Sequence, residues 1–252
     1  MKPKVQAYLN RIGYKNTPKT DFATLCELQN RHLKSIPYEN LDIMRDIPLS
    51  LELDDIYDKV VARNRGGYCF ELNAIFAWLL RELGFGVADY LGRFLRNETG
   101  VPMRRHRVLR VTCDDGDFLG DVGAGSAVPL IPLSLILGHE SRQGDELYKL
   151  DKEPFFGNVL YRWKKDEWER VYSFTEEEQH EIDFVMPSFY CEKHPESMFR
   201  KGDMVHIFTE DGRKSVAGRE VKIFSPNGVE VIIPGSEEEY HVLLERHFHI
   251  KL

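Results

Sequence analysis

One cysteine of this chain stands where a nucleophile is expected. Cys69 follows two glycines in the segment RGGYCFELN, residues 65–73, and apolar residues follow it at the spacing of a buried helix that ends near Gly84. The first N–H groups of a helix lack intrahelical partners and carry the positive end of its dipole, so we expect the pKa of a thiol there to fall. The segment therefore predicts a cysteine that attacks acyl carbonyls.

Such a cysteine needs a base that takes its proton and a third group that orients the base. His106 lies in an alternating, strand-like segment, and Asp121 ends the next segment of this kind. If the two strands pair as a hairpin, the Asp121 carboxylate lies beside the His106 imidazole. The spacing thus predicts a catalytic triad of Cys69, His106 and Asp121, like that of cysteine proteases.

Each of the three residues also has an ordinary structural interpretation. Cys69 fits a buried thiol on the core face of a helix, which is the commoner fate of a cysteine. His106 fits a strand histidine bonded to a backbone carbonyl, and Asp121 fits a carboxylate that closes a turn. Since nine histidines and 41 acidic residues offer many such triples, the spacing alone leaves both interpretations open.

The elements that must position these residues change along the chain. Apolar spacing predicts helices in the first third, among them one that begins after Asp21 and the central one that begins at Cys69. Beyond Gly86 a period of two predicts strands, with a helical interruption around 177–192 and a last helix from Ser236 to about residue 246. The expected strands cover residues 87–95, 105–113, 117–122, 146–151, 158–163, 168–174, 203–209, 213–217, 219–224 and 229–233. The order predicts a helical bundle, an antiparallel sheet or barrel, and a mixed α/β segment.

Composition narrows the classes of function. The 252 residues are 42% hydrophobic, which is enough for one large core or two to three small ones. A net charge of −7 and no basic stripe argue against a nucleic-acid partner. The longest apolar stretch, residues 128–137, is short and broken by prolines, and the charged N-terminus does not resemble a signal peptide. We therefore expect no association with a membrane.

The cysteines indicate a compartment as well as a nucleophile. They are far apart and form no CxxC pair, which argues against a zinc knuckle or a thioredoxin-type centre and favours the reducing cytoplasm. They are Cys26, Cys69, Cys113 and Cys191. His247 and His249 would share one face of a strand, but no carboxylate or thiol accompanies them, so we expect no metal site.

Four motifs together resemble the arylamine N-acetyltransferase family. The string RGGYCFELN, with LLRELGF at residues 79–85, is similar to the family's active-site signature, and IPYENLD at residues 36–42 is similar to its N-terminal motif. The segment 106–108 (HRV) resembles its histidine strand, and 121–123 (DVG) its aspartate motif. The four occur in the family's order and approximate spacing, over residues 1 to about 130.

The resemblance implies a fold and a reaction. The fold would be α+β: a helical bundle over residues 1–85 that carries the nucleophile, a central antiparallel β-barrel over 86–190 that carries the histidine and aspartate, and a C-terminal α/β lid over 191–252. Cys69 would take an acetyl group from the co-substrate acetyl-CoA and pass it, by a ping-pong mechanism, to an arylamine, hydrazine or N-hydroxyarylamine. This is the chemistry of xenobiotic metabolism, and it needs no metal.

The resemblance also implies supporting residues. Residues that would contact the substrate or CoA are Tyr38, Tyr68, Gly123, Ala124 and Gly125. Arg65 and Glu71 look like a structural ion pair of the family, although a glutamate at a helix start is equally explained by the helix dipole. Family members often read Gly-Phe-Gly-Gly where residues 123–126 read GAGS, so we expect a wider acceptor pocket. Residues 187–189 only loosely match the family's Asn-Pro-Ser motif, which puts the CoA contacts of the last third in doubt.

Three other functions fit parts of the pattern. An acyltransferase or amide synthase that acts on a longer biosynthetic acyl chain would use the same scaffold and the wider pocket. A thiol protease or amidase would use the same three residues, but the order of the motifs fits transferases. A protein that keeps the fold and uses Cys69 for ligand or redox sensing is the alternative without catalysis. The sequence does not specify the oligomeric state or the physiological acceptor.

Overall fold

The N-terminal third of the chain is helical, as the apolar spacing predicts. The computed structural model describes residues 1–96 and 98–252. The helices of this part are α1 (Pro3–Arg11), α2 (Phe22–Ser35), α3 (Leu41–Met44), α4 (Leu53–Tyr57), a π-helical turn (Asp58–Ala62) and α5 (Cys69–Glu82). The Asp21 side chain caps α2 by accepting a hydrogen bond from the Thr24 N–H at 2.8 Å. Helix α5 is buried on nearly all sides, so it is central to the core.

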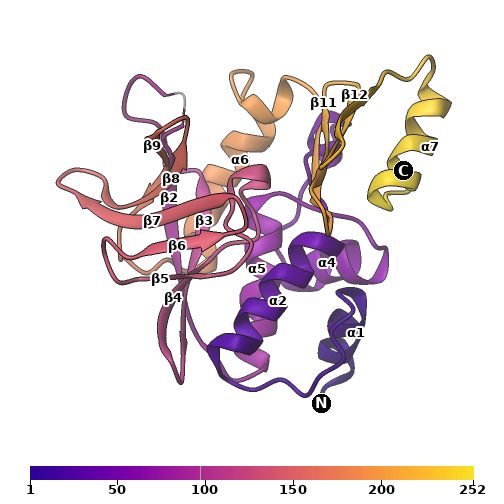
Figure 1. Ribbon diagram of the computed structural model, residues 1–252. Helices are drawn as coiled ribbons and strands as arrows, with labels where there is room; N and C mark the ends of the chain where they lie inside the picture. Colours follow the sequence, from indigo (N-terminus) through magenta and orange to yellow (C-terminus); the bar gives the residue numbers. More distant parts are fainter. Residues whose placement is uncertain (97) are drawn as a thin grey trace.

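A strongly curved antiparallel sheet forms the middle of the molecule (Figure 1). Its eight strands follow the order β5-β4-β3-β2-β9-β8-β7-β6, and β5 returns to contact β7, so the sheet is a nearly closed barrel. The strands are β2 (Gly86–Phe94), β3 (His106–Cys113), β4 (Gly116–Gly120), β5 (Leu133–Ser134), β6 (Glu140–Gln143), β7 (Glu146–Glu153), β8 (Gly157–Lys164) and β9 (Glu167–Phe174). The six longest were expected from the sequence; β5 and β6 were not.

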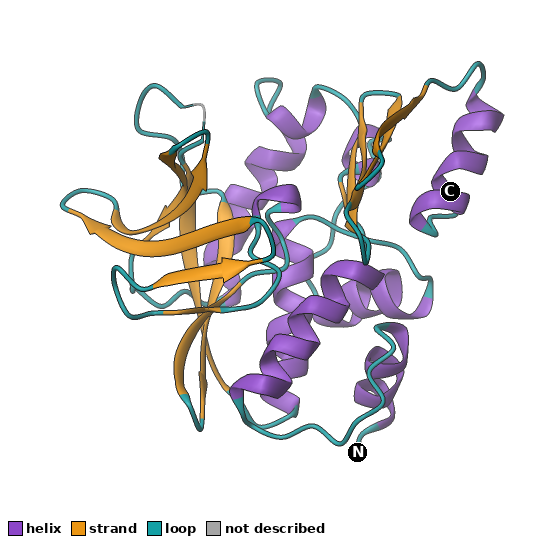
Figure 2. Cartoon of the chain, in the orientation of Figure 1, coloured by secondary structure: helices purple, strands orange, loops and turns teal. Residues whose placement is uncertain are grey.

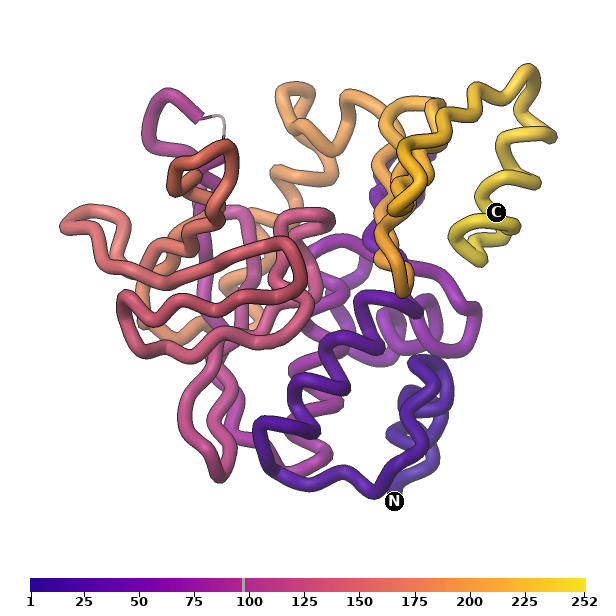
Figure 3. The backbone as a smooth tube through the Cα atoms, viewed as in Figure 1, coloured from indigo at the N-terminus to yellow at the C-terminus, as the bar shows by residue number. Residues whose placement is uncertain are grey.

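A second, smaller sheet brings together two segments that lie far apart in the chain. Its order is β1-β10-β11-β12-β13, where β1 (Tyr38–Glu39) comes from the helical third and the other strands come from the last quarter. These are β10 (Met204–Phe208), β11 (Arg213–Ala217), β12 (Glu220–Ser225) and β13 (Gly228–Ile232). The chain trace shows the early, indigo part beside the late, orange hairpin (Figure 3). Helix α7 (Glu237–Phe248) packs on this sheet through a small apolar cluster of its own.

Helices lie between the two sheets in the view of Figure 2. Helix α5 contacts the barrel strands β2 and β3, and α2 contacts β10 of the smaller sheet. A third helical part, made of a 3-10 turn (Glu181–Phe184), α6 (Val185–Lys193) and a second 3-10 turn (Met198–Arg200), connects the barrel to the smaller sheet. The helical interruption expected around 177–192 begins later, at Glu181. The predicted domain boundary after residue 190 falls inside α6. The division of the chain into three domains remains a prediction.

None of the helices in the described part of the chain has the length and apolar content that a membrane crossing requires.

Candidate active site

Cys69 is the first residue of helix α5, as the sequence predicts. The Glu71 side chain turns back and accepts a hydrogen bond from the Tyr68 N–H at 3.1 Å, which fixes the start of the helix. The Cys69 Sγ lies 3.7 Å from the carbonyl oxygen of Arg105, the residue that precedes His106. The helix therefore delivers the thiol to the beginning of strand β3.

The protonation of this thiol differs from the expectation. Burial raises the pKa of Cys69 well above its usual value, and the nearby Cys191 thiol and Asp121 carboxylate act in the same direction, while Arg105 acts in the opposite one. The side chain is 1% exposed, so the loss of hydration outweighs the favourable helix terminus. The prediction of a lowered pKa was wrong. A thiolate at this position needs a base that takes the proton.

His106 and Asp121 form a buried pair, because strands β3 and β4 pair as the predicted hairpin. His106 Nε2 lies 2.7 Å from Asp121 Oδ2, and the two side chains are almost completely buried. Since a carboxylate only accepts, Nε2 carries the proton and Nδ1 is left as an acceptor. Among the described residues His106 Nδ1 has no hydrogen-bond partner. The imidazole is thus oriented with one basic nitrogen free.

Two aromatic rings hold this imidazole in a dry environment. The ring centroid of Phe94 is 4.6 Å from that of His106, and the centroid of Tyr172 is 5.0 Å away. Both rings come from neighbouring strands of the barrel, β2 and β9. Packing of this kind restricts the imidazole to one orientation and keeps water from the His106–Asp121 hydrogen bond.

Asn73, one turn of α5 after Cys69, connects the helix to the aspartate. Its amide Nδ2 donates to Asp121 Oδ1 at 2.9 Å and to the Arg107 carbonyl at 2.6 Å, and its Oδ1 accepts from the Val122 N–H at 2.9 Å. The Gly123 N–H also donates to Asp121 Oδ1, at 2.7 Å. The sequence analysis gave Asn73 no role, although its spacing of four residues from Cys69 places both on one face of the helix.

Gly123 lies directly against the nucleophile. A Cβ atom added there would be 2.6 Å from the Cys69 Cα and 2.8 Å from Asn73 Nδ2, distances that real Cβ atoms do not reach. A side chain at this position would therefore push the start of α5 away from the strand end that carries Asp121. Gly123 therefore packs directly against Cys69 at the start of α5.

A cavity of about 730 Å³ opens beside these residues. Its wall includes Tyr38, Ala124 and Arg105, together with residues of the second 3-10 turn near Phe199. Further wall residues are Phe94, Arg96, Glu98, Val101, Pro102 and Met103. Gly125 packs on the Tyr38 ring, with a hypothetical Cβ 3.7 Å from it. Tyr68 does not line the cavity. It is fully buried and its hydroxyl bonds to the Ser188 Oγ at 2.5 Å, so the structure places Tyr68 in the support of the site.

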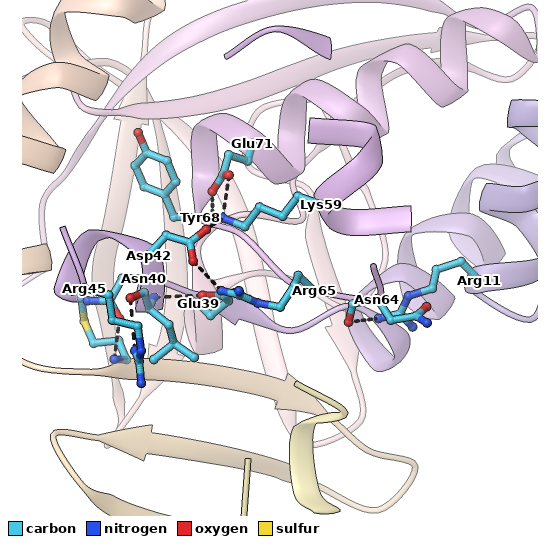
Figure 4. Close-up of polar contacts among 12 residues, drawn as sticks. Arg11, Glu39, Asn40, Asp42, Arg45, Lys59, Asn64, Arg65, Tyr68 and Glu71 are labelled. Carbon is cyan, nitrogen blue, oxygen red and sulfur yellow. Dashed lines mark hydrogen bonds and ion pairs between the residues drawn. The ribbon is translucent and has the colours of Figure 1, made fainter. Parts of the chain in front are cut away.

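A buried network of charges lies under the start of α5 (Figure 4). Arg65 bonds to Glu39 at 2.8 Å and to Asp42 at 2.8 Å, and Lys59 bonds to Asp42 at 2.7 Å and to Glu71 at 2.8 Å. The expected Arg65–Glu71 ion pair was therefore wrong: each of the two has other partners. The sequence gave no signal for Lys59, because the partners are brought together only by the packing of separate segments.

Lys59 keeps its positive charge inside this network. Burial lowers the pKa of Lys59, but the carboxylates of Glu71, Glu39 and Asp42 outweigh it, so the net shift is upward and the ammonium persists. Lys59→Met should reduce the free energy of unfolding by about 3–5 kcal/mol, because it leaves the Glu71 carboxylate buried without a counter-charge. Urea unfolding followed by circular dichroism measures this.

The matched control for that prediction is Lys2→Met. Lys2 pairs with Glu82, but its side chain is 73% exposed, so the substitution should change stability by less than about 1 kcal/mol. Equal losses of unfolding free energy in Lys59→Met and Lys2→Met would contradict a stabilising role of the buried network.

The two C-terminal histidines do not form a pair on a strand. His247 lies in the last turn of α7, and His249 follows the helix in a left-handed conformation with φ of 60°. The strand arrangement that the sequence analysis considered for them is not formed. No group of three or more histidine, cysteine, aspartate or glutamate side chains in the described ranges, 1–96 and 98–252, is placed to hold a metal ion.

Comparison with known proteins agrees with this geometry. A family model described as N-acetyltransferase matches residues 21–252. The chain is 35% identical over 231 residues to an arylamine N-acetyltransferase of Mycolicibacterium smegmatis, an alignment that covers 89% of this chain and 84% of the relative.

Solved structures agree over almost the whole chain. The arylamine N-acetyltransferase of M. tuberculosis superposes with a TM-score of 0.91 at 32% identity, covering 98% of this chain and 93% of the other. The enzyme of Mycobacterium marinum in complex with CoA gives a TM-score of 0.90 at 33% identity, covering 98% and 92%. With its helix-borne cysteine beside a buried histidine–aspartate pair on a nearly closed barrel, this chain belongs to the arylamine N-acetyltransferase family.

Proposed function

We propose that the protein transfers an acetyl group from acetyl-CoA to an arylamine through a thioester on Cys69. The observation that carries the proposal is the buried His106–Asp121 pair, 2.7 Å apart, at the strand end that Cys69 contacts beside a large cavity. Relatives that bear the name arylamine N-acetyltransferase support the acceptor class, and a relative with bound CoA supports the donor. Hydrazines and N-hydroxyarylamines are further acceptors in this proposal.

The first half-reaction forms the acyl-enzyme. His106 Nδ1 takes the proton of the Cys69 thiol, and the sulfur attacks the acetyl carbonyl of acetyl-CoA. When the tetrahedral intermediate collapses, the bond to the CoA sulfur breaks and the imidazolium returns the proton to this leaving thiolate. One thioester replaces another, so the step is nearly balanced in free energy. Asp121 stabilises the imidazolium that exists between the two proton transfers.

The second half-reaction consumes the acyl-enzyme after CoA has left. The amine nitrogen attacks the acetyl carbonyl on Cys69, and His106 takes the proton that the nitrogen loses. The bond to Cys69 Sγ then breaks, and the sulfur recovers the proton from the imidazolium. Conversion of a thioester to an amide is favourable, which makes the overall transfer proceed in this direction.

The cavity supplies the binding part of the proposal. Tyr38 and Ala124 line it, Gly125 packs on the Tyr38 ring, and we assign all three to substrate or CoA contacts. The bundle, barrel and lid would then meet at one site, with α6 and the smaller sheet covering it. The four cysteines are all free thiols, which supports a reducing, cytoplasmic location.

The test is intact mass and peptide mapping after the protein is mixed with acetyl-CoA and no acceptor. A single acetyl group on Cys69, removed when 4-aminosalicylate or a hydrazine is added, would demonstrate both half-reactions. Folded protein without this adduct would overturn acetyl transfer. Longer acyl thioesters are then the next donors, because a cavity of about 730 Å³ has room for them and the alternative function, acyl transfer or amide synthesis on a longer chain, predicts their use.

Ala124 should control the size of the acceptor. The side chain lines the cavity, and the family's Gly-Phe-Gly-Gly motif would place a phenylalanine there, so Ala124→Phe removes space in the cavity. We expect kcat/KM for a bulky amine such as 2-aminofluorene to fall about tenfold relative to aniline. The rate of acetyl-Cys69 formation in the same variant is the control. An unchanged ratio between the two amines would contradict this role.

A further inference from the structure

Strand β13 forms a free edge of the smaller sheet. Within the described part of the chain it pairs with β12 on one side and with no strand on the other. In Figure 1 this sheet and α7 lie on the opposite side of the molecule from the barrel. An edge strand presents a row of unpaired backbone N–H and C=O groups, to which another strand can bind.

The side chains on one face of this edge are apolar and exposed. Val229 is 57% exposed, Val231 is 49% exposed, and Ile233, which directly follows the strand, is 69% exposed. We call these three residues the edge triplet. Because side chains alternate along a strand and Ile232 packs in the cluster with α7, the edge triplet lies on the face away from α7. Natural sheets protect such an edge with a lysine, a proline or a bulge, and none of these interrupts residues 229–233.

The turns of this sheet decide which backbone groups face outward. Two residues that flank a two-residue turn exchange both hydrogen bonds, and pairs of this kind then alternate along the ladder. Ala217 and Glu220 flank the turn between β11 and β12, and Ser225 and Gly228 flank the turn between β12 and β13. Both turns lead to the same result: the N–H and C=O groups of the edge triplet point away from β12.

The edge triplet is complementary to a second copy of itself. In an antiparallel pair centred on Val231, that residue lies opposite its own copy, and Val229 lies opposite Ile233 of the other chain. This register joins outward N–H groups to outward C=O groups and places apolar side chains against one another. A slip of one residue would place Glu230 opposite Val231, and a slip of two would leave Val229 or Ile233 without an apolar partner.

No uncompensated charge meets at the centre of this pairing. Lys222 lies opposite Val231 on the neighbouring strand β12, and its ammonium is bonded to the carboxylate of Glu220 at 2.8 Å. The Glu230 side chain alternates to the other face of the sheet, on the side of α7. The joined edges would therefore have an apolar centre, with charges that are already paired at its rim.

We propose that two copies of this chain form a symmetric dimer by pairing their β13 strands antiparallel, which joins the two smaller sheets into one continuous sheet. Each Val231 N–H donates to the Val231 carbonyl of the other copy across the two-fold axis. One short strand buries less than the about 1,200 Å² of total area that stable complexes need, so the dimer should be reversible and concentration-dependent in the micromolar range. The proposal does not depend on acetyl transfer.

The first experiment is sedimentation velocity of the full chain over the micromolar range. The wild-type protein should shift from monomer to dimer, and Val231→Lys should raise the dissociation constant at least about tenfold, because two lysines then meet at the axis. The matched control is Phe189→Lys on α6, where the native ring is 59% exposed in another apolar surface. This variant should dimerise like the wild type.

A second pair of variants tests the register. Val229→Lys should weaken the dimer, because the introduced charge faces Ile233 of the other copy. The double variant Val229→Lys/Ile233→Glu should restore the dimer, since the proposed register places the two introduced charges directly opposite each other. Circular dichroism of each variant checks that the monomer remains folded. A double variant that stays as weak as Val229→Lys would contradict the register.

Covalent trapping tests the axis without a loss of affinity. Paired Cα atoms of this kind lie about 5.5 Å apart, within the range of a disulfide, so Val231→Cys should form a covalent dimer in a glutathione redox buffer. The wild-type protein and Phe189→Cys are the controls, and both should remain uncrosslinked. A wild-type chain that is monomeric at every concentration overturns the proposal. A dimer that survives Val231→Lys and is lost in Phe189→Lys also overturns it and assigns the contact to α6.

Discussion

Replacement of Cys69 by alanine will abolish acetyl transfer, because within residues 1–96 and 98–252 no other thiol has an oriented base beside it. The acetyl adduct seen after incubation with acetyl-CoA should disappear, and turnover of any arylamine should fall below detection. The fold should persist, since the change removes one sulfur atom from the start of α5 and leaves the Asn73–Asp121 contact intact. Intact mass, steady-state rates and a thermal unfolding curve check the three statements.

Cys191→Ala is the matched control for this prediction. Cys191 is a buried thiol of the same apolar cluster as Cys69, and burial raises its pKa to about 12. Among the described residues no hydrogen bond joins it to His106, so its removal should leave the acetyl adduct and most of the rate. Turnover that survives in Cys69→Ala, or that is lost equally in Cys191→Ala, would remove Cys69 from the role of nucleophile.

Replacement of Asp121 by asparagine should reduce kcat by about four orders of magnitude. An asparagine keeps an oxygen for the Asn73 and Gly123 donors, so its amide NH2 faces His106 Nε2 and donates to it. The imidazole must then carry its proton on Nδ1, the nitrogen that has to accept the proton of Cys69. The rate of acetyl-Cys69 formation in a rapid-mixing experiment measures the loss directly.

Asp117→Asn is the control for the loss of one carboxylate from the same strand. Asp117 lies on β4 and pairs with Arg110 at the surface, where its side chain is 38% exposed. The rate of this variant should match that of the wild type, and its stability should change by less than about 1 kcal/mol. A near-normal rate in Asp121→Asn would mean that another carboxylate orients His106.

These two predictions depend on features that a sequence pattern reveals well. The apolar spacing after Cys69 predicts a buried helix, and the alternation in two neighbouring segments predicts a hairpin, because both patterns depend on residues close together in the chain. The hairpin then decides which carboxylate meets His106, since pairing at its turn specifies the register across the strands. The six longest barrel strands and the last helix were predicted for the same reason.

The supporting contacts could not be predicted in this way. Lys59, Glu39 and Asp42 meet near Cys69 through segments that are separated in sequence and have no shared pattern, so the expected Arg65–Glu71 pair named the wrong partners. Strand β1 is two residues long and becomes a strand only because β10, from the far end of the chain, pairs with it. The three-part domain division remains a prediction.

The sequence by itself determined the longer helices and strands of this protein, the family they resemble and the three residues of its candidate triad, because local periodicity and the order of motifs encode them. Only the tertiary structure decided the environment of those residues. It buries the thiol of Cys69 so deeply that its pKa rises, assigns Asn73 to orient Asp121, and places Arg105 in the cavity wall. Solvation, buried charge and cavity shape arise from contacts between distant segments, and no short stretch of sequence contains them.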